Sequence, residues 1–353
     1  MSESNPRDKS IQFRIRSAPI ETLFPATTTE VYDTYWKFAA ERQAIFFRRF
    51  SGEQRPWTRD PILAAYKFTN AYRAADRVSQ FLIRKVIYSG HWDNPDLFFR
   101  IILFKLFNKI ETWTLLEREL GPISFREYSF RAYNQVLSNA FAHGQRIYSP
   151  AYIMASPGGT YGYARKHENH LRLLETMMDD LLPERIVEAD SMKMVFELLQ
   201  HYPSIGEFLA YQYAIDINYS TLTNFSEMDF VVPGPGAVDG IHKCFSNLGH
   251  LNYTDVIKLV TDRQQYEFDR LGLKFQTLWG RPLHLIDCQN LFCEVGKYAR
   301  LAHPSVKGIA DRKKIKQRFT PARQLIQYIF PPKWRLRVPK EAKGNDYDLD
   351  LFV

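Results

Sequence analysis

Residues 231–240 read VVPGPGAVDG, in which Pro-Gly-Pro-Gly separates an apolar run from a stretch with helical character. Glycine lets a backbone turn sharply and approach another group closely, because it has no Cβ. The start of the second helix would direct free N–H groups and partial positive charge toward an anion. The stretch therefore predicts a helix-hairpin-helix element in which Gly234 and Gly236 contact a phosphodiester. A tight loop without a ligand explains it equally well.

The composition is that of a folded protein. Apolar residues make up 45% of the 353 positions and aromatic residues 15%, enough for a sizeable core. Lys and Arg outnumber Asp and Glu by 47 to 39, an excess that favours polyanions such as DNA. Charges interrupt every long apolar stretch, and the N-terminus has no apolar signal core, so we expect a cytoplasmic protein without a membrane span. The three cysteines form no CxxC pair, so neither a disulfide framework nor a zinc site is expected.

Helical periodicity dominates the chain and predicts a mostly α fold, a helix-hairpin-helix bundle. We expect helices at 61–88, 96–120, 125–143, 166–182 and 204–217. In the last of these, Ser204 is the expected N-cap and Glu207 completes a capping box.

We expect four segments along the chain. These are an N-terminal arm (1–27), a helical domain with a base-pocket wall (28–203), a helix-hairpin-helix and catalytic Asp region (204–305), and a basic C-terminal segment (306–353). The basic segment suits phosphate binding and solubility equally. The sequence contains no GxxxxGK[ST] loop, which argues against a self-contained nucleotide kinase.

A polar stripe follows the predicted helix 61–88. Its members recur at spacings of three and four and therefore share one face; they are Asn70, Arg73, Arg77, Gln80 and Arg84. A solvated surface stripe is one interpretation. The wall of a ligand or nucleic-acid cleft is the other, because planar amides and guanidinium groups replace the usual Lys/Glu mixture.

Asp287 lies directly before an amphipathic helix. We expect it to be the N-cap of that helix, the usual role of an aspartate so placed. Free N–H groups and the helix dipole would then keep its carboxylate ionised. Beside a sugar C1′, an ionised carboxylate can stabilise positive charge and orient a water molecule, so Asp287 is also a candidate catalytic residue.

Three stretches, 57–80, 204–220 and 286–300, together with the hairpin, resemble the α-glutamyl/putrescinyl thymine pyrophosphorylase family within the helix-hairpin-helix superfamily of DNA glycosylases. The resemblance implies that Asp287 is the catalytic carboxylate and that Gly234 and Gly236 clamp the DNA backbone. Val238 stands where bifunctional members carry a lysine, and valine cannot form a Schiff base. The resemblance thus implies hydrolytic base excision that leaves an abasic site, with no metal or organic cofactor.

Related members act on hypermodified pyrimidines in phage DNA, such as glucosylated hydroxymethylcytosine, so the resemblance implies an anti-phage glycosylase that flips its base. The expected pocket comprises Gln289, Asn290, Glu294, Asn70, Arg73, Asp76 and Arg77, and the expected phosphate contacts include Lys243 and Lys297. Two alternatives stay open. One is a transferase that adds an amine or amino acid to a 5-substituted pyrimidine, and the other is a non-catalytic DNA-binding module.

Overall fold

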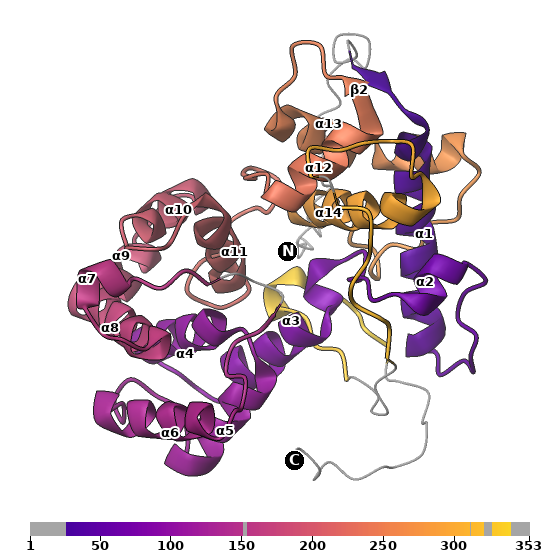
Figure 1. Ribbon diagram of the computed structural model, residues 1–353. Coiled ribbons are helices and arrows are strands. Elements are labelled where there is room, and N and C mark those ends of the chain that lie inside the picture. The colour runs from indigo at the N-terminus through magenta and orange to yellow at the C-terminus, as the bar shows by residue number, and fades with distance from the viewer. Residues whose placement is uncertain (1–25, 151–153, 311, 321–326, 340–353) are drawn as a thin grey trace, which may run out of the picture.

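The computed structural model describes residues 26–150, 154–310, 312–320 and 327–339. Within these residues the protein is mostly helical, and its helices form two groups (Figure 1). The predicted fold class is therefore confirmed. The predicted N-terminal arm lies almost entirely outside the described residues, and the basic C-terminal segment is described only in part.

The first group combines the beginning of the described chain with its later part. It contains α1 (Glu30–Phe50), α2 (Pro61–Ala65), α12 (Pro235–Cys244), α13 (Tyr253–Arg270) and α14 (Leu285–Ala302). A small antiparallel sheet of β1 (Thr27–Thr28) and β2 (Phe245–Asn247) joins the start of α1 to the end of α12. The hydroxyl of Tyr35 in α1 donates a hydrogen bond of 3.1 Å to the carbonyl of Cys288 in α14.

The second group is built around one buried helix. Its members are α4 (Asn94–Phe107), α5 (Ile110–Leu120), α6 (Phe130–Ala142), α7 (Gly158–Tyr161), α8 (Lys166–Asp179), α9 (Leu182–Val187), α10 (Met192–Gln200) and α11 (Glu207–Asn218). Every residue of α4 from Leu97 to Phe107 is buried, and the helix packs against α8, α9 and α11. The buried guanidinium of Arg100 in this helix donates hydrogen bonds to the carbonyls of Val86 and Ile123.

Short elements connect the two groups where a single helix over 61–88 was predicted. After α2 the chain is extended, and it then forms η2 (Arg73–Ala75), α3 (Arg77–Phe81) and a π-helical turn, η3 (Leu82–Ile87). The prediction of one helix is wrong because side chains bond the backbone locally. The Asp76 carboxylate accepts from the amide of Asn70, and the Asn70 side chain donates to the carbonyl of Ala75.

Two other predicted helices differ at specific residues. The helix expected over 96–120 is interrupted at Asn108, which adopts the left-handed conformation with φ of 48° and separates α4 from α5. The helix expected from Ser204 begins at Glu207, with Gly206 as N-cap and no side-chain cap. Ser204 has φ of 66° and lies outside the helix, so the predicted capping box is wrong.

The predicted hairpin leads into α12, which packs closely against α14. A Cβ on Gly240 would overlap the carbonyl oxygen of Phe292, and one on Gly296 would lie 2.9 Å from the Cα of Gly240. A Cβ on Gly236 would overlap the sulfur of Cys293. Gly240 therefore allows two helix backbones to touch, and Gly236 makes room for the Cys293 side chain, which accounts for both glycines without any ligand.

Candidate functional site around Asp287

Asp287 occupies the first turn of α14 but does not cap it. The N-cap is His284, and Asp287 is the third residue of the helix. Its Oδ2 accepts a hydrogen bond of 3.1 Å from the amide of His284. The predicted N-cap position is therefore wrong by three residues, although the carboxylate still accepts a hydrogen bond from a backbone N–H at the start of the helix.

The other oxygen of Asp287 reaches the element that connects the two groups. Oδ1 accepts a hydrogen bond of 2.9 Å from the backbone amide of Arg73 in η2. Asp287 is only 4% exposed. Burial raises the pKa of its carboxyl to about 6, against the opposing effects of nearby Arg281 and the two backbone amides. A carboxylate in this range can exchange a proton near neutral pH.

The side chain of Arg73 extends from the same residue into a buried ionic network. Its guanidinium binds both carboxylate oxygens of Asp216, at 2.7 and 3.0 Å, and donates to Gln212 at 3.1 Å. Lys105 from α4 lies 3.0 Å from the same carboxylate. Burial alone would raise the pKa of Asp216, but the two cations hold it below its ordinary value. Arg73 thus joins α14 of the first group to α11 and α4 of the second.

A second polar set lies beside Asp287 and is covered by the C-terminal part of the described chain. Arg281 pairs with buried Glu227 at 2.9 Å and lies 3.0 Å from Nδ1 of His284. The ring of Trp334, in η4 (Pro332–Trp334), lies 3.7 Å from the Arg281 guanidinium. Lys333 next to it donates to the carbonyls of Ser220 and Thr223, and burial lowers its pKa to about 8.

The other predicted pocket residues divide between several places. One cluster surrounds Thr69, whose amide donates to Glu294 at 3.0 Å and whose hydroxyl accepts from Asn290 at 3.0 Å. Asn70 and Asp76 adjoin it, and burial raises the pKa of Asp76 to about 7.

The remaining two pocket residues lie apart from that cluster. Gln289 is buried, and its amide nitrogen lies 3.1 Å from where a Cβ on Gly234 would be. Arg77 is exposed and lies 3.7 Å from Glu111 of α5. The structure therefore brings Arg73 to Asp287 but leaves Arg77 elsewhere.

The predicted phosphate contacts are engaged inside the protein. Lys243 is 3% exposed, donates to the carbonyl of Gly296 at 2.7 Å and lies 3.4 Å from Asp239. A phosphate contact would require it to leave both partners. Lys297 is more accessible and pairs with Glu294 at 2.8 Å. A role of these lysines and of Gly234 and Gly236 in binding DNA stays a prediction.

Sequence reasoning did not identify Asp216, Lys105, Glu227 or Arg281 as parts of the site. For Asp216 and Lys105 a signal was present, because each is a single charge within an apolar helical stretch, YAIDI and ILFKLF. A charge on a buried face requires an opposite charge nearby. The pattern indicates that a partner exists, but it does not indicate which residue that partner is.

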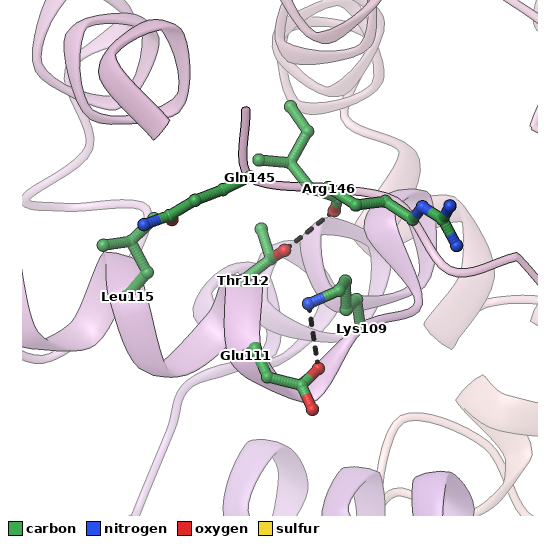
Figure 2. Close-up of a pocket in the computed structure, with 7 residues that line it drawn as sticks. Lys109, Glu111, Thr112, Leu115, Gln145 and Arg146 are labelled. Carbon is green, nitrogen blue, oxygen red and sulfur yellow. Dashed lines mark hydrogen bonds and ion pairs between the residues drawn. The ribbon is translucent and has the colours of Figure 1, made fainter. Parts of the chain in front are cut away.

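Two cavities lie outside the Asp287 site. One of about 310 Å³ is lined by the start of α5 and by residues 145–147 (Figure 2). The other, of about 380 Å³, lies beside residues 229–233 and the side chains of Phe196 and Lys258. In the described part of the chain, no three His, Cys, Asp or Glu residues are grouped as metal ligands. No helix among the described residues is long and apolar enough to cross a membrane.

Comparison with known proteins identifies a kinase family. Residues 29–308 match the family described as "5-hmdU DNA kinase, helical domain". A 5-hmdU DNA kinase of Bacillus phage SP10 is 29% identical over 295 residues, which cover 78% of this chain and 46% of that relative. The chain thus spans about half the length of the curated relative that it matches. No solved structure matches.

These matches correct the functional interpretation of the sequence. The resemblance to pyrophosphorylases and DNA glycosylases is wrong, because the kinase family covers all the stretches on which it rested. The predicted excision of a modified base, its abasic product and the anti-phage hydrolase role are wrong for the same reason. So is the predicted transfer of an amine or amino acid, since the relative is a DNA kinase. The matches likewise give no support to a purely non-catalytic module.

Proposed function

The chain belongs to the 5-hmdU DNA kinase helical-domain family, and from this membership we propose that it binds DNA containing 5-hmdU and holds that nucleotide for phosphorylation. The family match over residues 29–308 is the observation that carries the proposal. The net charge of +8 supports a DNA partner. A cytoplasmic location is part of the same proposal.

We assign to Asp287 the contact with the hydroxymethyl group of the 5-hmdU base. In a kinase reaction the hydroxyl oxygen bonds to the transferred phosphorus, the bond to the nucleoside diphosphate breaks, and the hydroxyl proton must leave. A carboxylate whose pKa is raised to about 6 is mostly ionised at neutral pH and still basic enough to orient the hydroxyl or accept its proton. The two backbone amides from His284 and Arg73 fix its orientation.

A base can reach Asp287 only if its covering residues move. Arg281 lies close to His284 at the start of α14, and Trp334 covers Arg281. Displacement of Trp334 would uncover Arg281 on this side of the site. Gln289 on the same helix is buried against Gly234, and its predicted contact with a base edge is part of this proposal.

The nucleotide side of the reaction is not assigned to this chain. Phosphoryl transfer ordinarily uses a nucleoside triphosphate with Mg²⁺, held by a phosphate-binding loop and carboxylates. The sequence has no GxxxxGK[ST] loop, and the described residues hold no group of three carboxylate, His or Cys side chains.

Binding to matched oligonucleotides tests the proposal. Fluorescence anisotropy would compare labelled duplexes that differ only in one 5-hmdU or thymidine. We expect binding to 5-hmdU to be tighter by about ten- to a hundredfold, since a hydrogen bond to a charged group contributes about 1.5–3 kcal/mol. Asp287→Asn should lose most of this preference, whereas Asp190→Asn, an exposed carboxylate elsewhere, should keep it. Equal affinity of the wild type for both duplexes would overturn the proposal.

A further inference from the structure

The cavity at the start of α5 is lined by polar and charged side chains. Lys109, Thr112, Gln145 and Arg146 lie around it with Leu115 and Ile147 (Figure 2). The hydroxyl of Thr112 donates to the carbonyl of Ile147 at 2.7 Å, which fixes the segment 145–147 against the helix. Its lining contains no residue of the Asp287 site.

Two cations contact one carboxylate at the edge of this cavity, and a third cation lies on the cavity wall. The Glu111 carboxylate accepts a hydrogen bond of 3.0 Å from Nζ of Lys109, and its other oxygen lies 3.7 Å from the guanidinium of Arg77. Arg146 is exposed at the cavity wall, and no ion pair of its side chain is found among the described residues. The local balance is therefore positive by two charges, which favours an anionic ligand.

The carboxylate of Glu111 lies between Lys109 and Arg77 and contacts both cations. Its side chain is 62% exposed, so water and ligands can reach it. Partial burial acts to raise its pKa, but its own backbone amide and the two cations outweigh this effect and lower it. A phosphodiester carries the same single negative charge as a carboxylate and also presents two anionic oxygens to Lys and Arg, so it would compete with Glu111 for these cations.

We propose that this cavity binds a backbone phosphate of DNA beside Lys109 and Arg146, and that Glu111 releases Lys109 and Arg77 when the phosphate enters. The inference rests on the proposed DNA binding and adds a contact in the second helix group. A phosphodiester fits better than a free nucleotide, because the lining contains no aromatic ring on which a base could stack.

Substitutions of opposite sign test the site. The measurement is the dissociation constant for a labelled duplex at several salt concentrations, by anisotropy, with circular dichroism to show that each variant folds. Lys109→Gln and Arg146→Gln should each weaken binding about three- to tenfold and reduce the log–log salt slope by about 1, the loss of one phosphate contact. Glu111→Gln should tighten binding by roughly threefold, because it removes the competing carboxylate.

Arg118 and Glu119 provide matched controls on the same helix. They are exposed and pair with each other at 2.7 Å. Arg118→Gln and Glu119→Gln make the same charge changes outside the cavity, so they report the effect of net charge alone. If the cavity variants only equal these controls, the phosphate site is refuted.

Two further measurements, ATP binding by the variants and the preference of the wild type for 5-hmdU, distinguish failure of the phosphate site from failure of the proposed function. If Lys109→Gln and Arg146→Gln weaken ATP binding and leave DNA affinity unchanged, the DNA assignment is refuted. A wild type that prefers 5-hmdU while the cavity variants equal their controls refutes this site alone. A wild type that shows no such preference, but loses DNA affinity with Lys109→Gln, refutes the proposed function and supports the site.

Discussion

The backbone amide of Arg73 donates a hydrogen bond of 2.9 Å to the carboxylate of Asp287, although 214 positions separate the two residues. The side chain of Arg73 meanwhile binds Asp216 through two hydrogen bonds. One residue therefore fixes the candidate carboxylate with its backbone and the second helix group with its side chain. The position of Asp287 depends on contacts that lie far from it.

Asp216→Asn should destabilise the protein strongly. The substitution leaves Arg73 and Lys105 buried without the charge that both now contact. Removing one partner from a buried ionic network typically costs about 3–5 kcal/mol. Urea unfolding followed by circular dichroism would measure the change, with the exposed Asp190→Asn as the control. A loss no larger than that of the control would show that the network adds no stability.

The stability contributed by Asp287 should fall as the pH rises from about 4 to about 6. The pKa of its carboxyl is raised from 3.8 to about 6 in the folded protein, so between these values the folded state holds a proton that the unfolded state lacks. Each unit of pKa corresponds to about 1.4 kcal/mol, which sets an upper limit of about 3 kcal/mol.

Comparison with Asp287→Asn isolates this effect. The free energy of unfolding of the wild type, minus that of the variant, should be greater at about pH 4.5 than at pH 7. Urea titrations at both pH values measure it. An unchanged or opposite difference would mean that burial does not raise the pKa of this carboxyl.

Gly240→Ala should disrupt the contact between α12 and α14. A methyl group there would overlap the backbone carbonyl of Phe292, which cannot rotate away as a side chain could. Overpacking of this kind costs about 1–3 kcal/mol and occasionally more. Gly159→Ala is the control, because nothing lies within 4 Å of its Cβ position. Thermal unfolding should show a lower midpoint for the first variant only.

DNA binding should weaken steeply with salt. If roughly five or six phosphates are neutralised, the logarithm of the association constant should fall with a slope of about −4 to −6 against the logarithm of the salt concentration. Anisotropy titrations of one duplex in increasing potassium chloride measure the slope. An affinity that does not change with salt would contradict the assignment of DNA as the partner.

The helical class was predictable because its signals are local, and its interruptions were harder to predict. Apolar periodicity located α6, α8 and α14 approximately. The break within residues 61–88 depends on hydrogen bonds of the Asn70 and Asp76 side chains to nearby backbone groups. The sequence does not reveal these bonds, because its polar residues also recur at helical spacing. Propensity alone does not reveal which of two local bonding patterns is more stable.

The site was predictable only in part, for a different reason. Asp287 and Arg73 were both identified, and the structure brings them together. Asp216 and Lys105 were not, because their relation to Arg73 depends on packing between helices distant in the chain. The chemistry was predicted wrongly because a glycine hairpin and a downstream aspartate indicate how the backbone turns, not which bond is broken.

The contact between α12 and α14 also affects how rapidly and selectively the hairpin could engage a partner. Gly240 and Gly296 bring the two helix backbones into direct contact, and Gly236 packs closely against the Cys293 side chain. The backbone around Gly234 is therefore ordered before any encounter, and association loses little further conformational entropy there. Such a rigid surface accepts only partners whose shape already matches it, so adaptation to DNA must come from elsewhere in the molecule or from the DNA itself.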